Sequence, residues 1–472
     1  MFLKQFYLSC LAHASYIVID ERTKAAAVID PQRDIEQYIE AASRYGATIR
    51  YVLLTHFHAD FIAGYLELRD RVGARIYLGD RAKAEYEFTR LKDGDALEFG
   101  DVRFRVRETP GHTPEGISVV VYDLAKNDRE PEAVFTGDTL FVGDVGRPDL
   151  MASVGVSADE LAGWLYDSLH HKLLELPDET VVYPAHGAGS MCGKNLSSET
   201  FSTIGEQRRF NYALQPMTRD EFKAVVTAEQ PEVPAYFGYD AKLNSMERAT
   251  LQENLKRVLQ PLSMDRLLEL RADGVQVLDV RDSADFAGSH MAGSINIGLG
   301  GKFATWAGTL LDREKKIVLV AEPGTEQEAA MRLGRIGLDG LVGYLDGGMG
   351  ALADHTGLIA TTDRITARAL ARQLDGPLAV PVVDVRTENE WEDGHIEGSL
   401  NLPLPHLVER ISELPGNAGF ALVCRSGYRS SIAASLLREN GLEEFRDTVG
   451  GMDAWTASSL PTTHPETPAC QG

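Results

Sequence analysis

The residues best suited to chemistry in the first part of this chain are histidines and aspartates that follow short apolar segments. Imidazole nitrogens and carboxylate oxygens are common ligands of transition metals. A single histidine of this kind is explained more simply as a hydrogen-bonded residue at a strand end, but four such strand ends together favour a metal site. Turn glycines such as Gly111 and Gly137 let the backbone bring these ends close. The candidate ligands are His56, His58, Asp60, His112, Asp138 and His186.

A second chemical motif is the segment 424–429, which reads Cys-Arg-Ser-Gly-Tyr-Arg. It follows an apolar segment at 420–423 and precedes a helical pattern, so its N–H groups should form an anion-binding site at a helix N-terminus. That field, with Arg425 and Arg429, should favour the thiolate form of Cys424 and make it a nucleophile. The alternative, a buried inert cysteine, fits less well with two arginines and a glycine in the loop.

The candidate metal ligands require a sheet, and the first 250 or so residues contain suitable short apolar segments. A strand pair is expected at 15–20 and 25–30, because polar residues interrupt the apolar run that would make residues 1–14 a signal peptide. The region 215–260 contains several prolines and is expected to be a helical docking and linker region. Further strands are predicted at 51–54, 102–106, 117–121, 133–135 and 181–183, with helices at 35–45 and 158–174.

The second half of the chain contains an internal repeat. The segment 277–281 (Val-Leu-Asp-Val-Arg) recurs as 382–386 (Val-Val-Asp-Val-Arg), and His290 and the residues after it recur from His395 at the same offset. In each copy, β-branched strands alternate with helical patterns, which is typical of a parallel sheet covered by helices. We therefore expect two related tandem domains.

The two copies differ at the position of the nucleophile. Ala321 follows the strand of the first copy where Cys424 follows that of the second, and glutamates replace the arginines of the loop. We expect the first copy to act as a spacer or docking module, without nucleophilic chemistry of its own. The expected domains are 1–250, including the helical linker region, then 262–355 and 363–465.

Composition limits the classes of protein that remain. The chain has 472 residues, and at roughly 100–200 residues per domain it should form two to four domains. Its 47 basic and 70 acidic residues give a net charge of −23, which opposes binding to nucleic acid or to anionic membranes. It has no apolar stretch long enough to span a membrane. Four scattered cysteines argue against a disulfide framework and favour the cytoplasm. The sequence leaves the oligomeric state open and allows a homo-oligomer.

The N-terminal motifs resemble those of the metallo-β-lactamase superfamily over roughly residues 1–250, through His56, His58 and Asp60 and the later His112, Asp138 and His186. The resemblance implies an α/β fold, an αββα sandwich, ahead of the two repeated domains. In that family a further histidine directly follows the motif aspartate and serves a second metal. Here that position is Phe61, which disfavours a dinuclear zinc hydrolase.

Without a second site, His56, His112 and Asp138 form the set of two histidines and one carboxylate that leaves open positions on non-haem Fe(II). This looks like the persulfide dioxygenase branch of the superfamily, in which these three positions hold one iron per chain. The resemblance implies a low-molecular-weight thiol persulfide, such as glutathione persulfide, and O₂ as substrates, and sulfite and thiol as products. The remaining motif residues, His58, Asp60 and His186, would orient the ligands or bind an alternative metal.

Two residues are candidates for contacts with the substrate. Arg147 lies in a Gly-Arg-x-Asp element of that branch and would be the counter-charge of an anionic thiol substrate. A structural salt bridge with Asp149 or Asp144 explains Arg147 equally well. Cys192 lies in a glycine-containing loop six residues after His186, close enough to exchange sulfur, and a small residue lining a loop is the equal alternative.

The tandem domains resemble rhodaneses over about residues 262–465, which implies α/β domains with parallel sheets. Four residues separate Cys424 from Arg429, one fewer than in cysteine phosphatases, and the tighter loop suits sulfane sulfur better than phosphate. Cys424 would carry this sulfur as a persulfide and exchange it with sulfite and thiosulfate. Two alternatives stay open: a glyoxalase II-like zinc thioester hydrolase with a sulfur-carrier rhodanese tail, and a sulfur-relay or scaffold protein whose first domain is catalytically silent.

Overall fold

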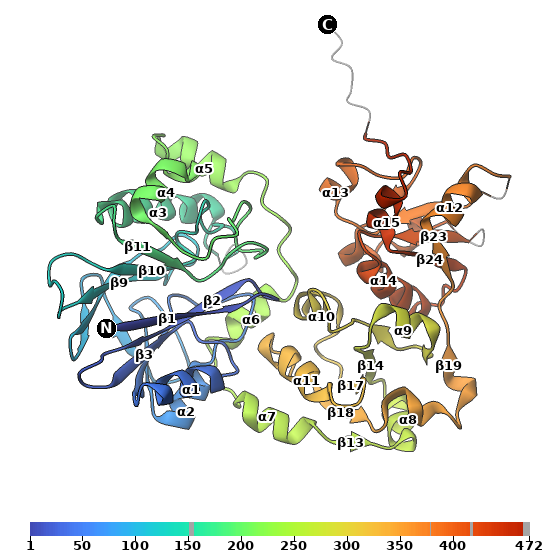
Figure 1. The fold of residues 1–472 in the computed structure, drawn as a ribbon, viewed down its shortest axis with the longest axis horizontal. Coiled ribbons are helices and arrows are strands. Elements are labelled where there is room, and N and C mark those ends of the chain that lie inside the picture. The colour runs from blue at the N-terminus through green and yellow to red at the C-terminus, as the bar shows by residue number, and fades with distance from the viewer. Residues whose placement is uncertain (151–154, 378, 416–418, 466–472) are drawn as a thin grey trace, which may run out of the picture. The chain divides into compact units, whose positions relative to one another are not determined.

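A computed structural model describes residues 1–150, 155–377, 379–415 and 419–465 (Figure 1). The chain divides into two compact units. The first comprises Met1–Asn254 with Met331–Asp339, and the second comprises the rest. The three cysteines of the described ranges are free, and Cys470 lies outside those ranges.

The first unit contains two six-stranded sheets. Strands β1 to β3 are antiparallel neighbours, which confirms the predicted opening strand pair. One sheet has the order β1 (Phe2–Leu8), β2 (His13–Ile19), β3 (Ala25–Ile29), β4 (Thr48–Leu53), β5 (Arg75–Gly79), β6 (Thr89–Leu91). The other has the order β12 (Ser202–Thr203), β11 (Val181–Pro184), β10 (Ala133–Gly137), β9 (Ile117–Asp123), β8 (Val102–Glu108), β7 (Ala96–Phe99).

The two sheets pack against each other through apolar faces. In β8, Val102, Phe104 and Val106 are buried while the arginines between them are more exposed, the alternation expected of a strand with one face in a core. These residues share one cluster with Tyr16 and Val18 of the other sheet. Helices cover the outer faces, so the predicted αββα sandwich is confirmed (Figure 1).

Both helices predicted in this region, at 35–45 and 158–174, are present. Ser157 caps the first helical turn after it by accepting a hydrogen bond from the backbone N–H of Glu160. The region expected to be a helical linker forms three helices, and Phe222 and Phe237 within it are buried, so it belongs to the core. The helices are α1 (Glu36–Arg44), α2 (Tyr65–Val72), α3 (Ala158–His171), α4 (Ile204–Phe210), α5 (Arg219–Thr227), α6 (Phe237–Leu243) and α7 (Leu251–Val258).

The second unit contains two five-stranded sheets whose neighbouring strands are all parallel, as predicted. The first has the order β13 (Pro261–Leu262), β18 (Leu341–Leu345), β17 (Ile317–Val320), β14 (Gln276–Asp279), β16 (Ile295–Asn296). The second has the order β20 (Arg364–Thr366), β24 (Phe445–Val449), β23 (Phe420–Val423), β21 (Val382–Asp384), β22 (Leu400–Asn401). Two further short strands, β15 (His290–Met291) and β19 (Ile359–Ala360), form a separate antiparallel pair.

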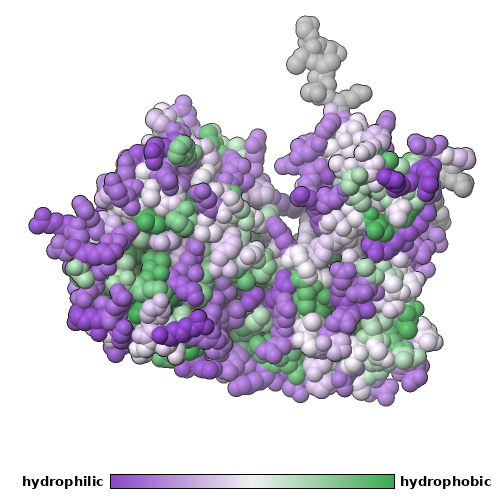
Figure 2. All heavy atoms as spheres, viewed as in Figure 1, coloured by the Kyte–Doolittle hydropathy of each residue, from purple (hydrophilic) through white to green (hydrophobic). Residues whose placement is uncertain are grey.

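Helices flank both parallel sheets. In the first module they are α8 (Met264–Ala272), α9 (Ser283–Gly288), α10 (Phe303–Leu310) and α11 (Glu326–Arg335). In the second module they are α12 (Ala367–Leu374), α13 (Glu388–Glu392), α14 (Tyr428–Glu439) and α15 (Gly451–Ala457). The described helices include none that is both long and apolar enough to cross a membrane. Figure 2 shows hydrophilic residues over most of the visible surface, with hydrophobic residues in scattered patches.

The repeated aspartate and arginine form the same ion pair in both modules. Arg281 pairs with Asp279 at 2.7 Å, and Arg386 pairs with Asp384 at the same distance. These buried pairs lie at the ends of corresponding strands, and in each module the arginine also donates to a backbone carbonyl eight residues later. The repeat therefore preserves a local brace that holds the loop after the strand.

Candidate functional site

The predicted metal ligands follow four strands of the sandwich. His56 comes after β4 in the first sheet, whereas His112, Asp138 and His186 come after β8, β10 and β11 in the second. The strand ends of both sheets therefore supply side chains to one place. As expected from the sequence, the structure brings these four residues together.

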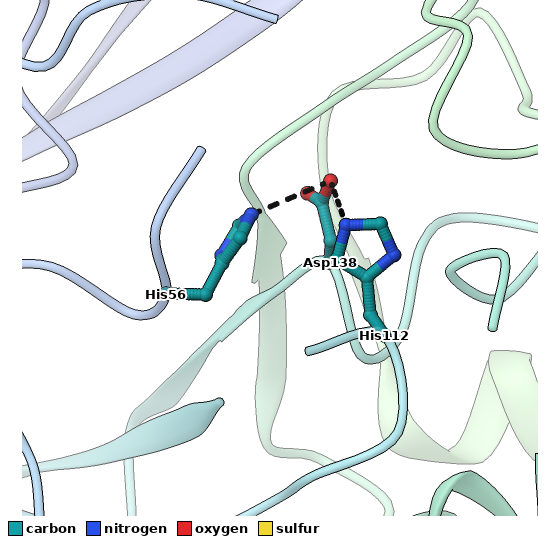
Figure 3. Close-up of side chains that lie close together, drawn as sticks. All are labelled: His56, His112 and Asp138. Carbon is teal, nitrogen blue, oxygen red and sulfur yellow. Dashed lines mark ion pairs between the residues drawn. The ribbon is translucent and has the colours of Figure 1, made fainter. Parts of the chain in front are cut away.

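His56, His112 and Asp138 form the first cluster (Figure 3). Both imidazole rings point toward the carboxylate. Nε2 of His56 lies 3.7 Å from Oδ2 of Asp138, and Nε2 of His112 lies 3.4 Å from the same oxygen. All three side chains are buried, and they line one pocket together with Thr109 and Thr139.

The other ring nitrogen of each histidine has a fixed partner. Nδ1 of His112 lies 2.9 Å from the carbonyl oxygen of Arg147, which only accepts hydrogen bonds, so this nitrogen carries the proton. Nδ1 of His56 lies 2.9 Å from Oγ1 of Thr55, whose hydroxyl donates to Asp30 at 2.8 Å, so His56 Nδ1 is again the donor. Each histidine therefore turns an unprotonated Nε2 toward Asp138, the tautomer that binds a metal.

The charges of the cluster also suit metal binding. Burial and the neighbouring His58 lower the pKa of His56 well below its usual value, and burial lowers the pKa of His112. Burial by itself would raise the pKa of Asp138, but its interaction with the neighbouring His186 outweighs burial and holds that pKa well below the usual value. Neutral imidazoles and an ionised carboxylate are the forms that coordinate a metal ion. The three residues therefore fit one bound ion, and both iron(II) and zinc accept such donors.

His58, Asp60 and His186 form a second buried cluster. Nδ1 of His186 lies 2.8 Å from Asp138, and its Nε2 lies 2.9 Å from Oδ2 of Asp60. Burial opposes the charged form of His186, but the carboxylates of Asp138 and Asp60 raise its pKa well above the usual value. His186 therefore lies between two carboxylates and orients Asp138 through its Nδ1.

His13 joins this second cluster, although no sequence pattern assigned it a role. Its ring centroid lies 5.5 Å from that of His186 and 4.0 Å from that of Phe61. The ring of Phe61 also lies 4.4 Å from that of His58, so it adds apolar surface and no donor atom here. Within the described ranges, the ring nitrogens of His13 have no hydrogen-bond partner, whereas Nε2 of His58 lies 3.2 Å from Oδ1 of Asp30. His13 reaches this second cluster through the tertiary position of β2, in which it is the first residue.

Arg147 is buried and forms the salt bridge that the sequence allowed. Its Nε and Nη2 donate to the carboxylate of Asp149 at 2.6 and 2.8 Å. Its main-chain carbonyl holds His112, as described above. Arg147 thus positions the candidate ligand His112 through its backbone, and its role as the counter-charge of a substrate stays a prediction.

Cys192 lies beside the metal cluster, as its place in the sequence suggested. Its Sγ is within 4.8 Å of ligand atoms of both Asp138 and His186. Burial and the charges of Asp138 and Asp60 raise the pKa of its thiol well above the usual value. In this environment Cys192 is a thiol, the weaker nucleophilic form. Its exchange of sulfur also stays a prediction.

Asn244, in the region expected to be a linker, holds the loop that carries His58. Its Nδ2 donates to the carbonyl oxygens of His58 and Phe61 at 2.8 and 2.7 Å, and its Oδ1 accepts from the backbone N–H of Ala63 at 2.9 Å. Asn244 is fully buried. The sequence offered no signal for this contact, because 186 residues separate Asn244 from His58.

The cysteine loop has the predicted strand–loop–helix form. Cys424 follows β23 directly, and α14 begins at Tyr428. The backbone N–H of Gly427 donates to Sγ of Cys424 at 3.1 Å, and Gly427 has a φ of 101°, which a glycine adopts without strain. Sγ also lies 3.4 Å from Oγ of Ser430 in the first turn of the helix. A helix N-terminus and an N–H donor both stabilise negative charge on the sulfur.

The two arginines of the loop differ in their surroundings. Arg429 donates to both carboxylate oxygens of Glu390 at 2.6 and 2.7 Å, and it also interacts electrostatically with Cys424. Arg425 is 72% exposed, and its Nε lies 3.6 Å from Asp453. Its side chain therefore faces solvent. In the first module the corresponding strand β17 is followed by buried Ala321, which has no nucleophilic atom.

Comparisons with known proteins agree with both halves of this description. A model of the metallo-beta-lactamase superfamily matches residues 9–186, and a model of the rhodanese-like domain matches residues 263–355 and 366–458. The cytoplasmic hydroxyacylglutathione hydrolase of Arabidopsis thaliana is 36% identical over 262 residues, covering 52% of this chain and 95% of that protein. The mitochondrial persulfide dioxygenase ETHE1 of Bos taurus is 29% identical over 226 residues, covering 48% of this chain and 80% of that protein.

A solved structure extends this similarity. The crystal structure of a metallo-beta-lactamase from Staphylococcus aureus subsp. aureus COL has a TM-score of 0.65 and 30% sequence identity, and covers 73% of this chain and 98% of that chain. These matches confirm the resemblances and the fold class predicted from the sequence. The chain therefore belongs to the metallo-β-lactamase superfamily, and two rhodanese-like domains follow its metallo-β-lactamase domain.

Proposed function

We propose that the metallo-β-lactamase domain is an Fe(II)-dependent persulfide dioxygenase and that Cys424 carries out rhodanese sulfur transfer. The observation that carries the proposal is the cluster of His56, His112 and Asp138, with two unprotonated Nε2 atoms facing one carboxylate. Two neutral histidines and one carboxylate are the donor set of non-haem iron oxygenases. The similarity to the Bos taurus persulfide dioxygenase supports the same assignment.

The reaction would convert a thiol persulfide, O₂ and water into the thiol, sulfite and two protons. Iron(II) bound at the cluster would supply redox chemistry and open positions for both substrates. The protein's part is to keep His56 and His112 in one tautomer through Thr55 and the carbonyl of Arg147. His186 fixes the carboxylate of Asp138, because its Nδ1 lies 2.8 Å from Oδ1 and 3.0 Å from Oδ2.

The second reaction would take place at Cys424. Its thiolate would attack the outer sulfur of thiosulfate, so that an S–S bond forms at Cys424 and sulfite leaves with the electron pair of the broken S–S bond. The N–H of Gly427 and the N-terminus of α14 stabilise the charge on the sulfur before and after transfer. Run in the opposite direction, this step would transfer the outer sulfur of a Cys424 persulfide to sulfite and form thiosulfate. Sulfite formed at the first site would then be a substrate of the second, so the two sites would share an intermediate.

A zinc thioester hydrolase is the second candidate function. The 36% identity to the Arabidopsis thaliana hydroxyacylglutathione hydrolase favours it, and zinc accepts the same donors. Against it, Phe61 offers no ligand and His186 is held between two carboxylates. Product analysis separates the candidates. Metal-loaded protein should convert glutathione persulfide and O₂ into sulfite and glutathione in equal amounts and leave S-lactoylglutathione intact. Thioester cleavage without sulfite formation would overturn the dioxygenase proposal.

A further inference from the structure

A buried chain of hydrogen bonds leads from the sulfur of Cys424 into the core of its module. Oγ of Ser430, in the first turn of α14, donates to Oδ1 of Asp447 at 2.5 Å. Sγ of Cys424 lies 3.4 Å from the same Oγ, with the thiol as the donor. All three side chains are at most 1% exposed. The carboxylate of Asp447 therefore acts on the sulfur through one hydroxyl group, away from solvent.

The single proton of the Ser430 hydroxyl decides the sign of this effect. A hydroxyl group has one O–H to donate, and a charged acceptor at 2.5 Å binds it more strongly than a neutral one. The second acceptor, the carbonyl oxygen of Gly427, lies 3.3 Å away. While Asp447 is ionised, Ser430 thus turns its lone pairs toward Sγ of Cys424 and stabilises the thiol form. The negative charge of Asp447 adds to this preference, because a nearby like charge disfavours a buried thiolate.

Charged groups from the neighbouring elements act on the same residues. On β20, Nε of Arg364 lies 3.3 Å from Oδ2 of Asp447 and favours the ionised carboxylate. Burial raises the pKa of Asp447, although the hydrogen bond from Ser430 and the charge of Arg364 oppose this effect. The charged side chains of the cysteine loop are held in two ion pairs, Arg429 with Glu390 and Arg425 with Asp453.

The carboxylate of Asp447 opposes the field that the loop itself provides. The N–H of Gly427 and the N-terminus of α14 both favour the thiolate form of Cys424. A thiolate that is stabilised too far becomes a weaker nucleophile, and the attacking thiol that reacts fastest has a pKa near the ambient pH. An anion that favours the thiol form therefore preserves the nucleophilic strength of the thiolate.

The cysteine-less module lacks these two partners as well as the nucleophile. Six residues after Ala321 it has Gln327, where the second module has Ser430. Tyr344 takes the place of Asp447, because each of them pairs with the third residue of the neighbouring strand, β17 or β23. The hydroxyl and the carboxylate thus accompany the cysteine within this one chain, as a role in its chemistry requires.

We propose that Asp447, acting through Ser430, opposes the stabilising field of the cysteine loop and so tunes the nucleophilicity of Cys424. Ser430 is a catalytic residue in this sense, because it touches the reacting sulfur, whereas Asp447 is a positioning residue. The inference rests on the proposed sulfur transfer at Cys424 and adds the residues that set the reactivity of that site.

Alkylation of Cys424 by iodoacetamide over a range of pH, followed by mass spectrometry of its peptide in the full chain, tests the proposal. Asp447→Asn keeps the shape and removes the charge. It should lower the pH midpoint of the alkylation rate by about one unit, and the limiting rate at high pH should fall about threefold because the thiolate is a weaker nucleophile. Ser430→Ala should lower the midpoint by a smaller amount. The matched control is Asp375→Asn at the exposed end of α12 in the same module, which should leave both values unchanged.

The sign of the shift separates this role from the opposite one, in which the Ser430 hydroxyl donates to the thiolate. In that case Ser430→Ala would raise the midpoint, and the proposal would be overturned. Loosening of the loop would also raise the midpoint, because it weakens the field of the helix N-terminus. An unchanged midpoint in Asp447→Asn, or an equal shift in Asp375→Asn, would contradict the proposal as well.

Sulfur transfer from thiosulfate to cyanide separates this inference from the proposed function. In Asp447→Asn, kcat/KM for thiosulfate should fall about threefold above the midpoint of the parent and rise below it, so that the two pH profiles cross. A parent that forms no thiocyanate but shows the predicted alkylation shifts would refute the transferase function and leave the tuning of Cys424 in place. Transfer by both proteins with superimposable pH profiles would instead overturn the tuning and leave the transferase function in place.

Discussion

Replacing Thr55 with valine is expected to weaken metal binding without removing a ligand. Oγ1 of Thr55 accepts from Nδ1 of His56 at 2.9 Å and donates to Asp30 at 2.8 Å, and all three residues are buried. Valine keeps the shape and loses both hydrogen bonds. The Nδ1–H of His56 then has no acceptor, so the other tautomer, which carries its proton on Nε2 and faces Asp138 with it, is no longer disfavoured. Outer partners of this kind contribute about 10- to 100-fold to metal affinity, or roughly 1.4 to 2.7 kcal/mol.

The assay is anaerobic titration of metal-free protein with Fe(II) against a competing chelator. Thr55→Ser, which restores an oxygen, should bind iron nearly as tightly as the parent. Thr109→Val is the matched control, because Thr109 lines the same pocket but pairs with Ser118 and not with a ligand. It should lower stability and leave the dissociation constant unchanged. Equal affinities for Thr55→Val and the parent would refute the tautomer argument.

Three further results are expected. Cys424→Ser should abolish thiocyanate formation from thiosulfate and leave oxygen uptake unchanged; loss of both activities would show that the two sites are not independent. Burial disfavours ionisation of Glu390, but its hydrogen bonds and charge pairing with Arg429 prevail and lower its pKa from 4.5 to about 2. The stabilisation by this ion pair is therefore fully present above about pH 4.5 and is lost as the pH falls toward 2. Chemical denaturation should show that Glu390→Gln is less stable than the parent at neutral pH, and that the difference shrinks between about pH 4.5 and 2. Asn244→Ala leaves buried backbone groups unpaired and should lower the free energy of unfolding by about 2 to 4 kcal/mol in urea titration. A decrease below about 0.5 kcal/mol, which is typical of a surface substitution, would contradict its bracing role.

The sequence was sufficient to predict that these candidate ligands meet, because the relevant signals are local. His56, His112, Asp138 and His186 each follow a short apolar strand closely, and strand ends meet in a sheet. The rhodanese repeat was equally readable, since its residues recur at a constant offset and form the same Asp–Arg brace in both copies.

The partners of these residues could not be predicted, because folding brings them from distant parts of the chain. Asp30 lies 25 residues from Thr55, and Asn244 lies 186 residues from His58. The sequence showed that Arg429 carries a charge, but only the structure shows that Glu390, 39 residues away, neutralises much of it. Residue type identifies the chemistry, and tertiary contacts decide the protonation state and the remaining charge.

The most direct test of the central claim is oxygen consumption by protein loaded anaerobically with Fe(II) and given glutathione persulfide, with the metal content measured on the same sample. The account predicts about one iron per chain and uptake of one O₂ for each sulfite formed, both lost in His112→Ala. Full iron loading without oxygen uptake, or uptake that persists in His112→Ala, would contradict it.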